Sequence, residues 1–166
     1  MGKISNDIGE IKKSAVVSRC GLYRYELRRV WDEDRPLVVW VGLNPSSADA
    51  RNDDPTNRRI AGFSRAWDFG GYILVNLFAL RAIDPAALKR AVDPVGPRNT
   101  VYLKRACKSA DAIICAWGNS GRFMDRARQV LPLIERPFAL EVTKVGEPKH
   151  PLYCRASLMP RDYRPG

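Results

Sequence analysis

The sequence predicts an α/β protein, specifically a three-layer α/β/α sandwich with a mainly parallel central sheet. Two observations favour this class. Four apolar runs have the length of a buried strand and are too short for a typical helix. Stretches with the apolar spacing of helices separate these runs, and this alternation is typical of parallel strands joined by helices.

The first of the four runs, Leu37 to Val41, is the strand around which the chain is organised. It stops at Gly42, and small polar residues follow it up to Asp49. Open α/β sheets place their ligands where a buried strand ends in such a loop and a helix follows. The other three runs predict strands over residues 72–77, 112–117 and 138–142.

An earlier strand is expected over residues 22–31, which are rich in aromatic and β-branched types. The turn-like residues 32–36 suggest that it forms a hairpin with the strand at 37–41. Three arginines of this strand are then phosphate-contact candidates, although an exposed structural charge explains them better: Arg24, Arg28 and Arg29.

Helices are expected at four places. Asp54 and Pro55 form an N-cap followed by a first-turn proline, and the helix should run to about Trp67 and end at Gly70 or Gly71. Asp84 and Pro85 repeat this device for a short helix through residue 90. The remaining helices are expected over 97–109, with Val101, Leu103 and Ala106 partly inward, and over 122–131; the tail over 146–166 is loop-like.

The length and composition predict one α/β domain over residues 21–166, preceded by an N-terminal arm over 1–20. The 28 Lys and Arg residues against 18 Asp and Glu residues give a net charge of +10, which suits a polyanionic partner such as nucleic acid. A basic surface without a dedicated partner explains the charge as well. The chain shows no signal-peptide core and no membrane-spanning run, so we expect a cytoplasmic protein without a membrane partner.

The four cysteines include no C-x-x-C pair, so reduced thiols are expected and neither a cofactor nor a metal is predicted. An iron–sulfur cluster would need all four to converge. The acidic residues Asp49, Asp53 and Asp54 raise the alternative of a divalent metal, although Asp54 is better explained as a helix cap.

Three of the predicted strands end in polar residues, in the segments 44–49, 76 and 118–120. The carboxyl ends of parallel strands lie at one edge of a sheet, so these residues should share one site. The single histidine, His150, lies between Pro148 and Pro151 after the fourth strand and should reach the same edge. Asn44 and Asn76 can each donate and accept hydrogen bonds, which suits reading a nucleobase or positioning a water.

Each of these three residues also has a structural explanation. Asn44 precedes a proline and fits a turn, Asn76 fits a buried cap on a loop, and a lone histidine is commonly a surface or packing residue. The chain contains no dinucleotide-binding, P-loop, zinc-protease or nucleophile-elbow motif. A hydrolase that uses Ser46 or Ser47 with His150 stays open, but no local pattern identifies a nucleophile.

Four segments, in chain order, resemble the motif series of the uracil-DNA glycosylase superfamily. They are Val41-Gly42-Leu43-Asn44-Pro45-Ser46, Ile73-Leu74-Val75-Asn76-Leu77, Ala116-Trp117-Gly118-Asn119-Ser120 and Lys149-His150-Pro151-Leu152. From Tyr23 to Tyr163 the chain also resembles, more closely, a bacterial family known as domain of unknown function sixteen forty-three. The hallmarks are Arg24-Tyr25-Glu26-Leu27-Arg28, Gly42 to Ser46, Asp53-Asp54-Pro55-Thr56 and Lys149-His150-Pro151-Leu152-Tyr153.

The glycosylase resemblance implies a uracil-DNA-glycosylase-like fold and a role for each matched residue. As catalytic residues, His150 would stabilise the departing base and Asn44 would position the attacking water. Asn76 would read the edge of a flipped base, with Trp117 and Asn119 also at the base. The loop near the phosphate would consist of Gly42, Pro45, Ser46 and Ser47.

Three functions follow as hypotheses. The first is a glycosylase-like protein that recognises a nucleobase in DNA or in a nucleotide and hydrolyses its N-glycosidic bond. The second is a non-catalytic nucleic-acid or nucleotide-binding module, which Asn44 favours because the most active glycosylases carry an aspartate at this place. The third is a metal-assisted small-molecule hydrolase that uses the acidic loop.

Overall fold

The computed structural model describes residues 10–166. Residues 1–9 of the predicted N-terminal arm lie outside the described residues. In the described part of the predicted arm, residues Lys12–Val17 instead form strand β1 of the sheet. In the described part of the chain, no helix has the length and apolar character needed to cross a membrane.

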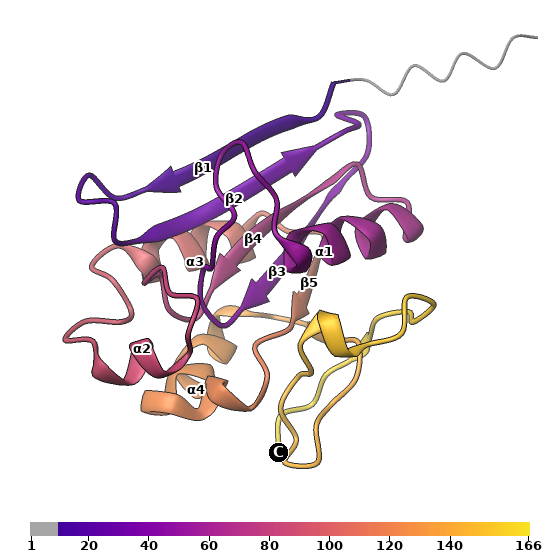
Figure 1. Ribbon diagram of the computed structural model, residues 1–166. Helices are drawn as coiled ribbons and strands as arrows, with labels where there is room; N and C mark the ends of the chain where they lie inside the picture. The colour runs from indigo at the N-terminus through magenta and orange to yellow at the C-terminus, as the bar shows by residue number, and fades with distance from the viewer. Residues whose placement is uncertain (1–9) are drawn as a thin grey trace, which may run out of the picture.

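The described chain forms one seven-stranded sheet in the order β1-β2-β4-β3-β5-β6-β7. Figure 1 shows the strands of this sheet running across the middle of the molecule. The strands are β1 Lys12–Val17, β2 Arg24–Val30, β3 Leu37–Gly42, β4 Gly71–Asn76, β5 Ala112–Cys115, β6 Pro137–Ala139 and β7 Arg161–Asp162.

The sheet is mixed, so the expectation of a mainly parallel sheet is not met. The inner strands β4, β3, β5 and β6 pair in parallel. The outer pairings, β1 with β2, β2 with β4 and β6 with β7, are antiparallel. A short turn connects β1 to β2, and a connection of that length cannot make the crossover that a parallel pair needs.

Helices cover both faces of the sheet, as expected for a sandwich. Figure 1 shows α1 on one side and α3 on the other. The helices are α1 Pro55–Ala66, α2 Ala86–Arg90, α3 Asn99–Lys108 and α4 Arg126–Val130, with 3-10 turns at Asn119–Asp125, Leu131–Leu133 and Pro151–Tyr153.

Two apolar clusters, one on each face, hold these layers together. On the α1 face, Trp40 of β3 stacks on Trp67 with ring centroids 5.6 Å apart and packs near Phe63. On the α3 and α4 face, the cluster includes Leu103 and Val130. Alternate residues of each inner strand belong to one cluster and then the other, so these strands are apolar along their whole length.

The predicted hairpin between the first strand and the strand at 37–41 is wrong. Strand β2 pairs with β1 and β4, and β4 lies between β2 and β3. The turn residues 32–36 do connect β2 to β3, but β3 is apolar on both faces and takes the position between β4 and β5. A position with a parallel neighbour on each side buries both of its faces.

The predicted helices are found, but some of their predicted details are wrong. Helix α1 starts at the predicted Asp54 cap but ends at Ala66, and the left-handed residue that follows is Asp68 rather than a glycine. Gly71 instead begins β4. On α3, where three residues were expected to be partly inward, Val101 is half exposed and Leu103 and Ala106 are buried.

Candidate functional site

A cavity lies where β3, β4 and β5 end, at the edge to which the sequence assigned the site. Its volume is about 450 Å³, within the usual range of small-molecule pockets. Seven predicted site residues line it: Gly42, Asn44, Ser46, Asn76, Trp117, Asn119 and His150. The other two do not, because Pro45 is buried and Ser47 is exposed outside the lining.

Asn76 is the last residue of β4 and only 3% exposed. It pairs in register with Gly42 of β3, where an added Cβ would lie 2.7 Å from the Asn76 Oδ1 atom. Within the described chain the Nδ2 atom of Asn76 has no hydrogen-bond partner. The glycine therefore leaves room for an amide that holds an unused donor at the cavity.

The backbone beside Asn76 is also fixed. The side chain of Asn99, at the start of α3, donates to the carbonyls of Asn76 and Leu77 at 2.9 and 3.0 Å. The backbone N–H of Leu77 donates to the Gly42 carbonyl at 2.9 Å. These bonds fix the strand end, and with it the position of the Asn76 side chain.

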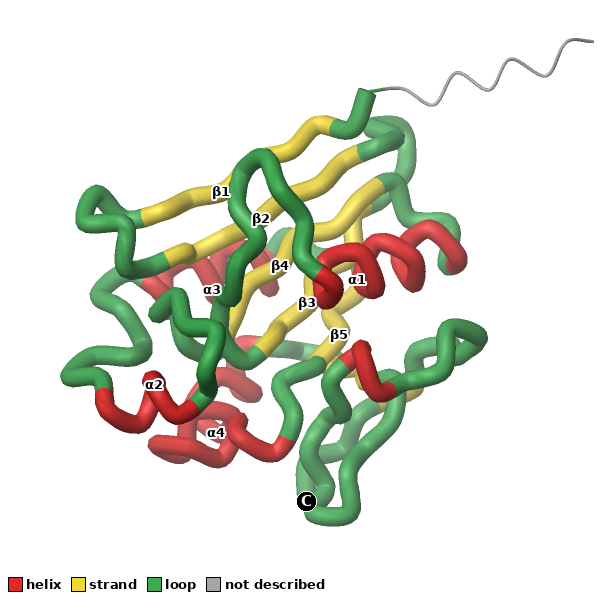
Figure 2. Tube along the Cα trace, viewed as in Figure 1, coloured by secondary structure: helices red, strands yellow, loops and turns green. Residues whose placement is uncertain are grey.

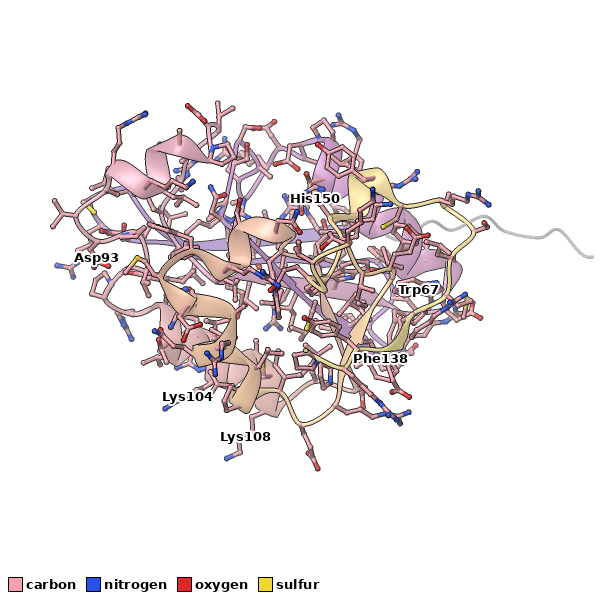
Figure 3. The ribbon with its side chains drawn as sticks, turned by 90° about the horizontal axis from the view of Figure 1, so that it is seen from below. Trp67, Asp93, Lys104, Lys108, Phe138 and His150 are labelled. Atoms are coloured by element: carbon pink, nitrogen blue, oxygen red, sulfur yellow. The ribbon has the colours of Figure 1, made fainter. Side chains whose placement is uncertain are left out.

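His150 reaches the cavity on a loop that returns from β6. The N–H of Gly118 donates to the Pro148 carbonyl at 2.7 Å, and the N–H of Lys149 donates to the Glu141 carbonyl at 2.8 Å. His150 then caps the turn Pro151–Tyr153, which packs against α1. In Figure 3, His150 lies on the opposite side of the molecule from Lys104 and Lys108 of α3, so these lysines do not add positive charge at the cavity.

The protonation of His150 follows from its contacts. Its Nδ1 atom accepts the backbone N–H of Leu152 at 3.2 Å, which leaves the proton of a neutral ring on Nε2. Burial lowers the pKa of His150 below its usual value, and the charge of Asp54 opposes this shift only in part. At neutral pH the residue is therefore an uncharged imidazole with an Nε2–H donor.

Asn44 has the turn role that the sequence left open, and it also lines the cavity. Its Nδ2 atom donates to the carbonyls of Pro45 and Ala82, at 2.9 and 2.8 Å. The amide nitrogen thus holds two loops together. The amide oxygen stays available to accept a hydrogen bond from a water, since no protein donor to it is present among the described residues.

Trp117 and Asn119 line the cavity, and each already uses one side-chain group in a hydrogen bond within the protein. The Trp117 ring is 1% exposed, donates from Nε1 to Glu147 at 2.8 Å and meets Tyr163 edge-on. It belongs to the apolar cluster on the α3 face. Asn119 is exposed, and its Oδ1 atom accepts the Thr143 hydroxyl at 2.7 Å.

The loop from 43 to 54 is held down by arginines of β2, which corrects the prediction that these arginines are exposed. Figure 2 shows this loop crossing β2 before it returns to α1. Arg29 is buried and its Nε donates to Asp53 at 2.8 Å, while Arg24, also buried, donates from Nη1 to the Ala48 carbonyl at 2.7 Å. Of the three, Arg28 is the one that keeps partial exposure.

The acidic residues of this loop each have their own partners. Asp49 accepts from the backbone of Arg51 and Asn52, and these bonds lower its pKa to about 2. Asp53 pairs with Arg29 and Lys13. Asp54 accepts three hydrogen bonds, from the backbone of Ala48 and from the backbone and side chain of Asn57.

These pairings leave the acidic loop without a metal site. Among residues 10–166, no group of three histidine, cysteine or acidic side chains is placed to hold a metal ion. The cysteines do not converge either. Cys107 and Cys115 lie in the cluster on the α3 face, Cys154 lies in the other cluster, and Cys20 is exposed.

Part of the cavity wall was not assigned to the site from the sequence. Arg24, which was a phosphate-contact candidate on an exposed strand, lines the cavity and is 2% exposed. Three further residues with outward-facing surface lie at the same cavity: Ile83, Leu152 and Tyr153. Ile83 is 82% exposed and Tyr153 is 75% exposed. An apolar side chain next to a cap or a proline carries no pattern that separates a cavity rim from an ordinary loop.

Comparison with known proteins identifies the family. Residues 24–152 match the protein family described as "Protein of unknown function (DUF1643)". This match spans most of the chain, so the chain belongs to that family, as its hallmark segments predicted. No curated protein and no solved structure matches the chain.

Proposed function

We propose that this member of the DUF1643 family recognises a nucleobase in its cavity, in DNA or in a nucleotide, in the manner of a glycosylase. The observation that carries the proposal is the buried Asn76 amide, whose Nδ2 donor has no partner among residues 10–166. Leaving a buried donor unpaired costs about 1–3 kcal/mol, so a ligand that brings an acceptor is favoured there. Nucleobase edges carry acceptors beside donors, the pattern that an amide complements.

His150 supports hydrolysis of the N-glycosidic bond as the reaction. When that bond breaks, the bonding electrons leave with the base, which becomes an anion. The neutral Nε2–H of His150 can donate to an oxygen or nitrogen of the base as this charge develops. A donor fixed in advance by its loop stabilises the departing base without any rearrangement.

Asn44 supports the remaining step, in which water attacks the sugar carbon. Its amide oxygen can accept a hydrogen bond from the water and orient it, while its nitrogen stays on the Pro45 and Ala82 carbonyls. A base in duplex DNA would have to leave the stack to enter the cavity, whereas a free nucleotide would not. The resemblance of the four motif segments to glycosylases supports the same roles.

A second candidate, a non-catalytic binding module, is favoured by a different observation. Asp54 is the carboxylate among the described residues that line the cavity, and three hydrogen bonds occupy it as a helix cap. An amide oxygen orients a water but does not take its proton. With no free carboxylate at the water, recognition of the base is better supported than rapid hydrolysis.

The test is to incubate the protein with single strands, duplexes and free nucleotides that carry uracil, hypoxanthine or modified pyrimidines. Released base is measured by chromatography and binding by calorimetry. We expect Asn76→Ala and His150→Ala each to lower base release by about 10²–10³-fold. Ser47→Ala, which lies outside the cavity, is the control and should leave it unchanged.

The outcomes separate the two candidates. Binding that requires Asn76 without any release of base, across the whole panel, would favour the binding module. Unchanged turnover in both cavity variants would remove the site assignment. Absence of binding to every base, in DNA and in nucleotides at low salt, would overturn the proposal as a whole.

A further inference from the structure

We infer that Arg24 is an anion-binding residue and that the natural ligand of the cavity is a free nucleoside monophosphate, whose terminal phosphate pairs with the Arg24 guanidinium. This inference rests on the proposed function for the base, and it adds the chemical class of the ligand. Arg24 is 2% exposed and lines the same cavity as Asn76 and His150.

An irregularity in β2 turns Arg24 toward the cavity. In the pairing of β1 with β2, Val16 lies opposite Glu26 and Val17 lies opposite Arg24, so Tyr25 is passed over as a β-bulge. Strict alternation would put Tyr25 and Leu27 on the same face. Instead Leu27 joins the cluster on the α1 face, and the Tyr25 ring stacks on Tyr102 of α3 at 5.1 Å.

The consequence of the bulge is that Arg24 points to the α1 face, where the cavity lies. A regular strand would have directed this side chain to the opposite face, against α3. Bulges commonly re-aim a side chain next to a functional site. The backbone of Arg24 is fixed there as well, because its N–H donates to the Ala79 carbonyl, three residues beyond Asn76, at 2.9 Å.

Within residues 10–166 no carboxylate forms an ion pair with the guanidinium of Arg24, and the charge of Asp54 acts on it from a longer distance. Its Nη1 atom donates to the Ala48 carbonyl, and its Nε atom has no partner within the described residues. No carboxylate oxygen of residues 10–166 lies within 4.0 Å of it, since the oxygens of the neighbouring Asp54 serve the α1 cap. Burial lowers the pKa of Arg24 to about 10, which still leaves it charged at neutral pH.

Arg29 on the same strand shows what a structural arginine looks like here. It is equally buried, but its Nε donates to Asp53 at 2.8 Å and its Nη atoms donate to backbone carbonyls. A buried charge without such pairing is destabilising, and removal of the partner from a buried ion pair costs several kcal/mol. An anionic ligand that makes charge-assisted hydrogen bonds to Arg24 would supply the missing partner.

The surroundings of Arg24 favour a terminal phosphate over the phosphodiester of a polynucleotide. A diester has a strand leaving on both sides, and an arginine residue that is 2% exposed leaves no route for two strands. Polynucleotides are also held by several basic residues along a groove. Arg24 is the one lysine or arginine among the described residues that line the cavity, and two strongly exposed residues there, Ile83 and Tyr153, carry no charge.

The test measures binding by calorimetry for matched pairs of nucleoside and nucleoside 5′-monophosphate, with inorganic phosphate and a single-stranded oligonucleotide as further probes. We expect the wild-type chain to bind one monophosphate at least tenfold more tightly than its nucleoside. Arg24→Gln should bring the two affinities within about twofold of each other. Asn76→Ala should weaken nucleoside and monophosphate alike and leave their ratio unchanged.

Two controls protect the interpretation. Arg28→Gln alters the partly exposed arginine of the same strand, which pairs with Glu26, and should keep the wild-type ratio. Near-ultraviolet circular dichroism checks that each variant is folded. If Arg24→Gln does not fold, the wild-type ratio and the charge-preserving Arg24→Lys still decide, because Lys should retain most of the preference for the monophosphate.

Each outcome supports or overturns one part. Equal affinity for nucleoside and monophosphate in the wild-type chain would overturn the inference on Arg24 and leave base recognition intact. A preference for the monophosphate that is the same for every base and independent of Asn76 would support the role of Arg24 and overturn the proposed function. Tighter binding of the oligonucleotide than of any monophosphate would overturn the assignment of a free nucleotide, and absence of all binding would overturn both proposals.

Discussion

At the scale of single residues, the pair formed by Gly42 and Asn76 offers a sharp test of the site. An added Cβ at Gly42 would meet the Asn76 Oδ1 atom at 2.7 Å, so the amide must turn away from its position. We expect Gly42→Ala to weaken nucleoside binding at least tenfold. The chain should still fold, with a loss in unfolding free energy of about 1–3 kcal/mol, since the atom in the way belongs to the end of a side chain.

Gly62 of α1 is the matched control for this substitution. An added Cβ there meets no atom within 4 Å, and the residue has ordinary helical backbone angles. Gly62→Ala should therefore raise the unfolding free energy by about 0.5–1 kcal/mol and leave binding unchanged. If Gly42→Ala bound nucleosides as well as Gly62→Ala does, the Asn76 amide would not be the base-reading group.

The same residues show what a sequence can reveal about a site. Asn76 and His150 follow strands whose apolar runs are visible, so their meeting at one edge could be predicted from the chain. Arg24 could not be found in this way. Its direction depends on a bulge at Tyr25, and that bulge arises from the pairing with β1, which local sequence does not encode.

At the scale of elements, the chain uses Asp followed by Pro to start two helices, and the structure places the two copies in different surroundings. Asp54 is buried and accepts three hydrogen bonds at the start of the twelve-residue helix α1. Asp84 is exposed and accepts one, from Ala86, but it lies one residue before the cap position of the five-residue helix α2, which Pro85 occupies. The same sequence signal thus located the cap of α1 correctly and placed that of α2 one residue too early.

We expect Asp54→Ala to lower the unfolding free energy by about 2–3 kcal/mol, because it removes the cap and leaves the Ala48 N–H and the Asn57 amide without an acceptor. Asp84→Ala should cost about 0.5 kcal/mol, because Asp84 precedes the cap position of α2 and accepts a single exposed hydrogen bond. Urea unfolding of both variants measures this contrast. If both variants lost the same unfolding free energy, Asp54 would contribute to stability only as a helix cap and not through the loop that it holds.

At the scale of the whole molecule, the inner sheet was predictable and its borders were not. Strands β3, β4 and β5 are long apolar runs, which mark buried strands whatever their neighbours are. Strand β1 has mostly exposed side chains, and β7 has two residues, both exposed. Such edge strands owe their form to hydrogen bonds with a partner strand, so no pattern in their own residues indicates them.

This difference between inner strands and edge segments predicts that the two walls of the cavity open with different ease, which hydrogen exchange can measure. All six residues of β4 are buried, so the wall that carries Asn76 should open only with global unfolding. The His150 wall is a loop held by a few backbone bonds, such as that from Gly118 to Pro148. Amides over 141–154 should therefore exchange faster than those of β3 and β4 in the free protein.

A bound nucleotide should change the exchange rate at the His150 wall alone. If His150 donates to the base, the added contact should slow exchange over 141–154 severalfold while β4 stays at its global limit. Adding the nucleotide to His150→Ala should remove most of this slowing, although the ligand still occupies the cavity. Equal slowing in the wild-type chain and in His150→Ala would show that the loop closes on the ligand through its backbone, and that His150 is not the group that meets the base.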